Sequence, residues 1–547
     1  MTQPWWKTAT GYQIYPRSFC DSNGDGIGDI PGIISKLGHL EELGIGFIWL
    51  CPVYASPMRD NGYDIADYRN IAPEFGTMED FERLLSEARR RNIRIVMDLV
   101  VNHCSNEHPW FQAACASREA PEHDYYYWRA PAPDGGPPDD QRACFGGSAW
   151  HWVEAVGKYA YCHFGPQQPD LNWQNPALRA KIYDMMNWWL DKGLGGFRLD
   201  VIDLLGKDID ARIYHDAPDL HPLLAEMHSR CFAGRDIVTV GEAWSARPDT
   251  ALSYTGRARR ELDMVFSFNH IEAGWDPIKG RYGGSRFDLV THKSVLADWQ
   301  TALAEDGWNS LYLSNHDLPR PVSFYGDEGP GRVASAKMLA TVTYLMRGTP
   351  FVFQGEEIGM TNADFTSVDQ FRDIEALGQA REQLALGVSE AEFVAGARVN
   401  GRDNARTPVQ WSSAHHAGFT TGTPWIDVNA NHAEINVDAD KAAPDGIFAH
   451  YRELIGLRRI LPVISQGDFQ LLWPEHPDLF AYTRRLRETV LFVLGNFSGK
   501  PVTLDRDELP KGPWTSLLAP FPEVCLFDPA PQLPPYYSGA WISSVAD

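Results

Sequence analysis

The chain has 547 residues, of which 44% are hydrophobic and 22% are charged, and its formal net charge at pH 7 is −23. This length allows two or three domains, one of them a large barrel, and the composition is typical of a folded globular protein rather than a disordered one. The strong negative charge excludes nucleic acid and anionic membrane as partners, because both would repel the protein, whereas small neutral ligands stay open.

The first residues do not combine a basic segment with an apolar one, and no run of 18 apolar residues occurs in the sequence. We therefore expect a cytoplasmic protein that is a monomer or a homodimer. The eight cysteines form no C-x-x-C pair and no zinc spacing, which favours free thiols without a special role. The 19 tryptophans and 21 tyrosines could stack on sugar rings, although most such rings pack in protein cores.

The first motif along the chain is the segment DSNGDGIGD, residues 21–29. Acidic or amide side chains at alternate positions of a tight loop can direct their oxygens at one calcium ion. An EF-hand also needs a glutamate at the twelfth position, which is Gly32 here, and a helix before the loop, where this chain has a strand-like pattern. We predict one structural calcium site, with magnesium or a metal-free solvated turn as the alternatives, and no organic cofactor. The expected ligands are Asp21, Asn23, Asp25, the Ile27 carbonyl group and Asp29.

Short apolar runs alternate with helical patterns through most of the chain, as in a parallel sheet of β–α units. Several runs are apolar on both faces, as buried parallel strands are. Eight such units predict an α/β fold with a (β/α)8 TIM barrel. The predicted strands are residues 11–16, 46–52, 93–100, 195–201, 236–244, 264–269, 309–315 and 349–355, and the helices include 30–44, 78–91, 175–193 and 333–348.

Two intervals are too long for a single connecting helix. The interval after the third strand is rich in Pro, Gly, Asp and aromatic residues, which predicts an inserted subdomain over residues 104–172. The second, residues 358–405, follows the eighth strand and contains a helical pattern. Short alternating runs then predict a C-terminal antiparallel β-sandwich domain over residues 467–547, which leaves residues 1–103 and 173–466 to the catalytic barrel.

Polar residues gather where four of the predicted strands end. In a barrel of this kind the carboxyl ends of the strands form the active site. Each of these motifs alone is more often structural, but their occurrence on four strand ends favours a shared catalytic site. They are Asp98, Asn102 and His103 at the end of the third strand, Arg198 and Asp200 at the end of the fourth, Glu242 at the end of the fifth, and Asn315, His316 and Asp317 at the end of the seventh.

Two of these carboxyl groups suit complementary roles. Arg198 and Asp200 are two residues apart on a strand and point to the same side, so the guanidinium is expected to keep Asp200 ionised, as a nucleophile requires. The apolar neighbours of Glu242 are expected to raise its pKa, as a general acid requires. Two carboxyl groups in different environments predict hydrolysis of an acetal through an oxocarbenium-like transition state.

With these residues the chain resembles the α-amylase superfamily of glycoside hydrolases (family 13), and within it the branch of oligo-1,6-glucosidases and α-glucosidases. The resemblance covers residues 12–411, where the motifs follow one another in the order of that family. They are DLVVNH (98–103), QPDLNW (168–173), GFRLDVID (196–203), GEAW (241–244) and SNHD (314–317), together with YQIYPRSF, DNGYDI, FQGEEIGMTN and GRDNARTPVQW.

The resemblance implies a role for each matching residue. Asp200 corresponds to the nucleophile that forms a covalent β-glucosyl enzyme, Glu242 to the acid/base, and Asp317 to the residue that holds two sugar hydroxyl groups. Asp60 and Arg402 match a pair that closes the pocket beyond the glucose, which implies an exo-acting enzyme. The remaining substrate-binding residues implied are Tyr63, which would stack under the sugar ring, His103, Phe164, Arg198 and His316. The loop of residues 21–29 resembles the single metal site of this branch.

Val201, directly after the expected nucleophile, is similar to members of the family that cleave α-1,6 bonds, whereas members that prefer α-1,4 bonds tend to carry threonine there. A valine is apolar and stiff, so it shapes the leaving-group side by packing and offers no hydroxyl group. Isomaltose and short isomalto-oligosaccharides are therefore the expected substrates. Three residues depart from the pattern of the family: Cys104, Asp203, which stands where asparagine is usual, and Leu318. They are expected near the entrance for the leaving group.

Other activities share the same catalytic residues. Sucrose isomerases and transglucosylases differ in whether water or a sugar intercepts the glucosyl enzyme, and the isomerases carry an Arg/Asp-rich loop where this chain reads FDLVTHKSVLADW. Hydrolysis is therefore favoured, with sucrose, trehalulose or α-1,4-linked sugars as alternative substrates. A noncatalytic relative of the transporter-associated heavy chains is a remote alternative, because those proteins need a membrane-spanning helix and have lost the catalytic carboxylates.

Overall fold

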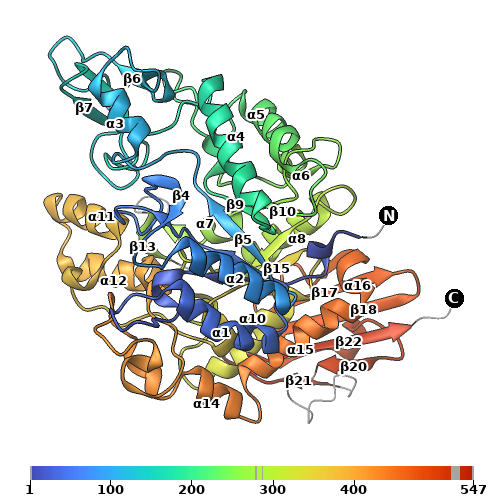
Figure 1. Ribbon diagram of the computed structural model, residues 1–547. Coiled ribbons are helices and arrows are strands. Elements are labelled where there is room, and N and C mark those ends of the chain that lie inside the picture. Colours follow the sequence, from blue (N-terminus) through green and yellow to red (C-terminus); the bar gives the residue numbers. More distant parts are fainter. Residues whose placement is uncertain (1–2, 277–279, 286, 519–529, 545–547) are drawn as a thin grey trace.

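The computed structural model describes residues 3–276, 280–285, 287–518 and 530–544, and it contains the predicted barrel (Figure 1). Within these residues the barrel strands are hydrogen-bonded in parallel in the order β11-β10-β9-β5-β2-β1-β15-β14. All eight predicted strands are confirmed. They are β1 (Gly11–Ile14), β2 (Phe47–Leu50), β5 (Arg94–Leu99), β9 (Gly196–Leu199), β10 (Val238–Glu242), β11 (Met264–Phe266), β14 (Ser310–Tyr312) and β15 (Thr349–Phe353).

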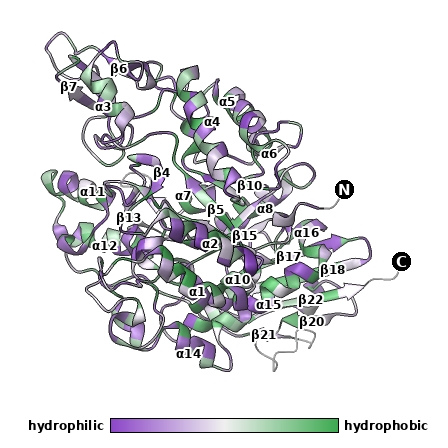
Figure 2. Ribbon diagram, in the orientation of Figure 1, coloured by the Kyte–Doolittle hydropathy of each residue, from purple (hydrophilic) through white to green (hydrophobic). Residues whose placement is uncertain are grey.

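A hydrogen bond from a side chain to the backbone joins the two outermost strands of this order. The hydroxyl group of Ser310 on β14 donates a hydrogen bond of 2.7 Å to the carbonyl oxygen of Val265 on β11. Every residue of β1, β2, β10, β11 and β15 is buried, because helices cover the outside and side chains fill the inside. In Figure 2 hydrophobic residues are frequent in the centre of the molecule, where β5, β10 and β15 are labelled.

Some of the helices around the barrel begin at a residue whose side chain caps their free N–H groups. The side chain of Asp29 accepts from Gly32 at the start of α1, Thr77 forms a capping box for α2, and Asn175 caps α4 ahead of a proline. The helices are α1 (Ile30–Leu43), α2 (Met78–Arg90), α4 (Pro176–Asp191), α5 (Leu220–Met227), α6 (Ala251–Thr255), α7 (Asn269–Glu272), α8 (Leu289–Ala302), α9 (Pro321–Tyr325), α10 (Arg332–Tyr344), α13 (Asp403–Arg406), α14 (Val437–Ala442), α15 (Ile447–Ile460) and α16 (Pro462–Gln466).

Two insertions rise above the carboxyl ends of the barrel strands (Figure 1). The insertion after β5 contains α3 (Pro109–Ala116) and an antiparallel sheet of β6 (Trp128–Arg129), β8 (Lys158–Tyr161) and β7 (Trp150–Val153). The insertion after β15 contains α11 (Ile374–Ala385) and α12 (Glu390–Asn400), where the sequence predicted a helix. Two small hairpins complete this face: β3 (Tyr54–Ala55) with β4 (Asp67–Ile71), and β12 (Trp275–Asp276) with β13 (Gly280–Ser285).

The end of the chain forms the predicted antiparallel β-domain, which packs against α10. Its larger sheet has the order β16-β17-β18-β22-β20 among the described residues, and β19 pairs with β21. The strands are β16 (Asp468–Leu472), β17 (Leu479–Leu486), β18 (Thr489–Asn496), β19 (Val502–Thr503), β20 (Thr515–Leu518), β21 (Gln532–Leu533) and β22 (Ser538–Ser544). The predicted domain also includes residues 519–529 and 545–547, which lie outside the described ranges.

The cysteines of the described ranges are free thiols, as the sequence predicted, and most of them are buried; Cys525 lies outside those ranges. No helix in the described part of the chain has the length and the apolar character needed to cross a membrane. The segment 287–299, which stands where sucrose isomerases carry an Arg/Asp-rich loop, lies mostly in helix α8.

Candidate active site

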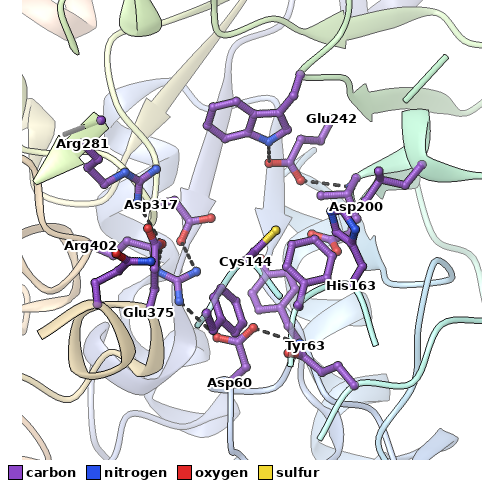
Figure 3. A pocket seen from close by; sticks show the side chains of 18 of the residues that line it. Asp60, Tyr63, Cys144, His163, Asp200, Glu242, Arg281, Asp317, Glu375 and Arg402 are labelled. Carbon is purple, nitrogen blue, oxygen red and sulfur yellow. Dashed lines mark hydrogen bonds and ion pairs between the residues drawn. The ribbon is translucent and has the colours of Figure 1, made fainter. Parts of the chain in front are cut away.

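The polar strand ends converge on one cavity of about 490 Å³ at the carboxyl ends of the barrel strands (Figure 3). Asp200, Glu242 and Asp317 all line it, so the carboxyl groups that the sequence singled out face a common space. Of the predicted substrate-binding residues, the cavity wall includes Asp60, Tyr63, His103, Phe164 and Arg402. Arg198 and His316 lie directly behind this wall, each 1% exposed.

Arg198 connects the carboxyl groups beneath the cavity. Its Nη1 atom donates to Asp98 at 2.8 Å and to Asp200 at 2.7 Å, and its Nη2 atom donates to Glu242 at 2.6 Å. The guanidinium lies 4.9 Å from the centre of the Trp49 ring, which supports it from inside the barrel. The prediction that Arg198 and Asp200 point to the same side is therefore confirmed. One cation fixes the relative positions of both expected catalytic carboxyl groups.

Glu242 is held by three donors. Besides Arg198, the backbone N–H of Val201 donates to its Oε2 atom at 3.0 Å, and the indole of Trp244 donates to its Oε1 atom at 3.1 Å. Trp244 was expected to act only as an apolar neighbour, but it also orients the carboxyl group. Burial raises the pKa of Glu242, as predicted, and Arg198 opposes that effect.

The pKa shift of Asp200 runs opposite to the one predicted from Arg198. Burial is the largest effect and, together with the carboxyl groups of Glu242 and Asp98, raises the pKa of Asp200 well above its usual range, although Arg198 opposes the change. One guanidinium serves three carboxyl groups, which the local Arg-x-Asp spacing could not reveal. Asp200 and Glu242 therefore affect each other's titration.

Asp317 has a different environment, because two arginines face it. Its Oδ1 atom accepts from Arg406 at 2.8 Å and from Arg402 at 3.4 Å, and its Oδ2 atom lies 3.3 Å from Nε2 of His316. Burial alone would raise the pKa of Asp317, but His316 and the two guanidinium groups lower it below the usual range. The structure therefore offers a firmly ionised carboxylate opposite the Asp200–Glu242 pair.

The cavity ends at an ion pair between Asp60 and Arg402, whose closest atoms are 3.4 Å apart. Gln168 donates to Asp60 at 3.0 Å from the insertion after β5, and Arg402 packs 5.1 Å above the ring of Phe145. Asp373 anchors Arg402 from behind at 2.5 Å. Burial raises the pKa of Asp60 to about 7, although Arg402 opposes the change. Asp60 and Arg402, the pair that the family resemblance implied, therefore contact each other at this end of the cavity.

Aromatic rings form the floor and one side of the inner cavity. Tyr63 stacks on His316 with ring centres 5.2 Å apart and an interplanar angle of 5°, and its hydroxyl group donates to Asp98 at 3.0 Å. The ring of Phe164 lies 5.0 Å from that of His103. Burial lowers the pKa of His103 to about 4 and that of His316 to about 3, so both rings are neutral at pH 7.

A buried lysine joins the inserted subdomain to this wall. Nζ of Lys207, on the loop after β9, donates at 2.6 Å both to Asn102 and to Asp170 of the insertion. Asn102 contacts Nδ1 of His103 at 3.0 Å. The same cation therefore holds both His103 and the inserted subdomain. This contact fixes the position of side chains from the insertion that line the cavity, such as Phe164.

Val201 carries backbone strain beside the expected nucleophile. Its φ and ψ angles are 36° and 46°, a left-handed conformation that is an outlier for a β-branched residue. This conformation turns the backbone N–H toward Glu242 and leaves the side chain lining the cavity. Neither Cys104 nor Leu318 lines the cavity, so the expectation that all three departures lie near the entrance is wrong for these two, which are buried in the packing. Asp203 does not line the cavity itself but contacts His215, which does.

Sequence reasoning missed most of the outer cavity wall. These residues come from loops and from short or inserted elements such as α7, β13 and α11, which lack a recognisable motif, and only their position in space brings them to the site. They are Cys144, Phe145, His163, Leu204, His215, Glu272, Trp275, Gly280, Arg281, Tyr282, Glu375 and Gln379. The one available signal was the aromatic and Gly-rich composition of the insertions, which does not identify individual residues.

The loop of residues 21–29 folds over its own backbone. Asp21 accepts from the N–H groups of Asn23 and Gly24, and Asp25 accepts from that of Ile27 at 2.9 Å. Asp29 is 2% exposed and accepts from Gly32 at 2.6 Å as the cap of α1, so it is the least available of the predicted ligands. In the described residues no group of three or more His, Cys, Asp or Glu side chains has the geometry of a metal site.

The cavity thus combines two carboxyl groups bound to one guanidinium, an ionised carboxylate and an ion pair at its inner end. Two carboxyl groups on one guanidinium can deliver an attacking oxygen and a proton to the same bond. Neutral histidines and an aromatic floor suit a sugar ring, which presents apolar faces and hydroxyl groups at its edges.

Comparison with known proteins agrees with this arrangement. The model of the alpha-amylase catalytic domain matches residues 13–467. The chain is 50% identical over 541 residues to a palatinase from Erwinia rhapontici, with 98% of each chain covered. It is 48% identical over 515 residues to an oligo-1,6-glucosidase from Halalkalibacterium halodurans, with 91% of each chain covered. Among solved structures, an isomaltulose synthase from Protaminobacter rubrum superposes with a TM-score of 0.95 at 39% identity, covering 99% of this chain and 100% of the other.

Proposed function

Because the chain belongs to the alpha-amylase family of glycoside hydrolases, we propose that it is a retaining, exo-acting α-glucosidase that hydrolyses terminal nonreducing α-glucosyl linkages. Its preferred substrates are α-1,6-linked sugars, isomaltose and short isomalto-oligosaccharides. The observation that carries the proposal is that Asp200 and Glu242 share one cavity whose inner end is closed by Asp60 and Arg402. A closed end accepts one terminal glucose and stops a chain from passing through.

In the proposed mechanism, Asp200 attacks the anomeric carbon while Glu242 protonates the oxygen of the leaving sugar. Glu242 carries a proton at this step, and Asp200 is ionised. Water then attacks the glucosyl enzyme, and Glu242 takes its proton. Binding of both carboxyl groups to one guanidinium supports the short separation of a double displacement, roughly 5–5.5 Å, rather than the roughly 6.5–9.5 Å that leaves room for a water in inverting enzymes.

The glucose ring is held by the groups that surround the inner cavity. Asp317, kept ionised by two arginines, binds two hydroxyl groups of the ring, and His103 and His316 act as neutral hydrogen-bonding groups. Tyr63 lies beneath the ring and Phe164 at its side. Asp60 and Arg402 bind the hydroxyl groups farthest from the bond that is cleaved.

The α-1,6 preference has two supports, the valine at position 201 and the relatives named oligo-1,6-glucosidase and palatinase. The second candidate is hydrolysis, isomerisation or transglucosylation of sucrose-type disaccharides such as sucrose and trehalulose, and the likeness to an isomaltulose synthase favours it. Cleavage of α-1,4 bonds is a further alternative. The noncatalytic alternative is disfavoured, because the carboxyl groups of Asp200, Glu242 and Asp317 are all present in the cavity.

Proton NMR of isomaltose hydrolysis tests the reaction. We expect α-glucose as the first anomer, followed by slow mutarotation, because two inversions restore the configuration. First formation of β-glucose would refute the double displacement. Glucose and transfer products assayed with isomaltose, maltose, sucrose and trehalulose then separate the hydrolase from the second candidate, which predicts rearranged disaccharides from sucrose.

We also propose that the loop of residues 21–29 binds one structural calcium ion, with magnesium as the alternative. The oxygens of Asp21, Asn23, Asp25 and the Ile27 carbonyl suit a hard cation. Chelation with EDTA should lower the melting temperature by several degrees, and added calcium should restore it. A variant with Asp21→Asn and Asp25→Asn should no longer respond to either treatment, and an unmodified protein that does not respond would contradict the site.

The cytoplasmic location and the choice between monomer and homodimer stay predictions.

A further inference from the structure

The leaving-group side of the cavity can be located from the acid. On the proposed function, Glu242 protonates the oxygen that joins the glucose to the leaving sugar, so the leaving sugar lies beyond Glu242, away from Asp60. Trp244 and Val201 contact Glu242 directly and line the same cavity. The loop residues next to them are therefore the ones that a leaving sugar meets first.

His215 is one of these residues, and it is held by Asp203. Its Nδ1 atom lies 3.1 Å from Oδ2 of Asp203, and that oxygen also accepts from the backbone N–H of Ser245 at 2.8 Å and from its hydroxyl group at 2.7 Å. Ser245 follows Trp244 in the chain, which ties this contact to the acid side of the cavity. Because Oδ2 accepts from a backbone N–H, it acts as an acceptor toward His215 as well, and Nδ1 carries a hydrogen.

The loop that presents His215 is also fixed. Asp208 and Ile213 form an isolated antiparallel bridge, and the N–H of Asp216 donates to the carbonyl oxygen of Asp203 at 2.9 Å. The residues on both sides of His215 are thus anchored, one of them to Asp203 itself. The imidazole side chain is nevertheless 40% exposed and lines the cavity. Its position is set by the protein while its outer edge stays open to a ligand.

Burial gives a second reason to assign Asp203 a role. The Asp203 side chain is fully buried, and its Oδ1 atom has no hydrogen-bond partner among the described residues. A buried carboxylate with an unpaired oxygen is costly, and the asparagine usual at this position would satisfy Ser245 without burying a charge. Stability therefore does not favour the carboxylate. An amide could present the same oxygen to Ser245 and to His215, but only a carboxylate adds negative charge to the hydrogen bond from Nδ1 of His215 and offers no donor in either orientation.

We propose that His215, positioned by Asp203, is a specificity-determining residue for the leaving group. Its Nε2 atom, which has no protein partner in the described ranges, binds a hydroxyl group of a sugar leaving group. The site therefore selects hydroxyl-bearing leaving groups over aryl ones that fit the same space. Asp203 acts as the positioning residue because it fixes which ring nitrogen carries hydrogen.

The test compares two substrates that share the glucose and differ in the leaving group: isomaltose and 4-nitrophenyl α-glucoside. His215→Ala should lower kcat/KM for isomaltose about tenfold, the loss of one hydrogen bond to the leaving sugar, and change it less than about twofold for the aryl glucoside. His215→Gln, which keeps a polar group near Nε2, should recover part of the loss. Asp203→Asn should reduce the same ratio of kcat/KM values without a comparable loss on the aryl glucoside.

Turnover of the aryl glucoside reports that each variant is folded and that its catalytic carboxyl groups work. As a matched control, His151→Ala removes an exposed histidine on β7 that does not line the cavity, and it should leave the ratio unchanged. Equal losses on both substrates in His215→Ala, or no loss on either, would overturn the role of His215 and leave the proposed function intact. An unmodified protein that hydrolyses neither substrate would overturn the proposed function and this inference with it.

Discussion

The two ends of the cavity are built differently. At the inner end Asp60, Asp317 and Arg402 are joined in one buried network, where each arginine serves more than one carboxylate. At the outer end two charged pairs lie apart from this network, His215 with Asp203 and Glu272 with Arg247 at 3.4 Å. Arg281 instead joins the network through Glu375, which lies 3.2 Å from Arg281 and 3.3 Å from Arg402. Substitution of one residue in the inner network therefore affects the others, whereas each outer pair can be substituted without affecting the rest.

This difference indicates where chemistry and specificity reside. Shared buried ion pairs fix geometry, because removing one partner leaves an uncompensated charge in a medium of low dielectric constant. Pairs at a half-exposed rim cost less to alter, and they touch only the part of the substrate that leaves. We therefore expect substitutions at the inner end to affect all α-glucosides alike, and those at the outer end to affect some leaving groups more than others.

The largest effect is expected for Asp200→Ala. Loss of the nucleophile should reduce kcat by at least about four orders of magnitude for isomaltose and aryl glucoside alike, because no glucosyl enzyme can form. Circular dichroism should show an unchanged fold. Asp249→Ala, a change at an exposed carboxylate on the loop after β10, serves as the control and should retain full activity. Normal turnover by the Asp200 variant would refute the common inner site.

Glu242→Gln should affect substrates with different leaving groups to different extents. Its kcat/KM for isomaltose should fall roughly 10²–10⁴-fold, whereas the aryl glucoside, whose leaving group needs little protonation, should lose less in glycosylation. Burial raises the pKa of Glu242, so the protonated acid is lost only as the pH rises through that raised value. The unmodified enzyme should show this alkaline limb in a pH profile of kcat/KM for isomaltose, and the variant should lack it. If the variant kept the alkaline limb, a residue other than Glu242 would be the acid.

Arg402→Ala should open the closed end. We expect KM for both substrates to rise about 10–100-fold, with a smaller change in kcat, because the contact binds the glucose and not the bond that breaks. Arg402 also opposes the raised pKa of Asp60, so in the variant this pKa should rise further above about 7. Titration of KM against pH reports that shift. An effect confined to one substrate would contradict the uniform behaviour expected of the inner end.

The smallest effect is expected for Val201→Thr at the outer end. The ratio of kcat/KM for isomaltose to that for maltose should fall by roughly tenfold or less, because the change adds one hydroxyl group and keeps the shape of the side chain. The aryl glucoside, which lacks a linkage between two sugars, provides the control and should change little. An unchanged ratio would remove Val201 from the determinants of linkage preference.

Much of the fold followed from local patterns. The eight barrel strands and the helices at 30–44, 78–91 and 175–193 were predicted within a few residues, because strands buried on both faces and capped amphipathic helices leave clear signals. The small hairpins β3–β4 and β12–β13 were not predicted. Their strands are short and their pairing depends on neighbouring elements.

The site divides in the same way. Asp200, Glu242 and Asp317 could be identified because each lies at or shortly after the end of a strand, and parallel strands bring their carboxyl ends together whatever the loops do. The raised pKa of Asp200 could not be predicted, since it depends on burial and on Arg198 serving Asp98, Asp200 and Glu242 at once. His215, Glu272 and Arg281 could not be found either, because they lie on a loop, on α7 and on β13, which are separate in the chain and carry no motif.

The sequence by itself determined the barrel, the order of its strands and the polar residues at their ends, because these depend on periodicity and short-range spacing. The tertiary structure alone decided how those charges are shared, which loops complete the outer wall, and that Asp203 reaches the cavity through His215. The physical reason is that burial and electrostatic coupling arise between residues distant in the chain, so no local pattern records them.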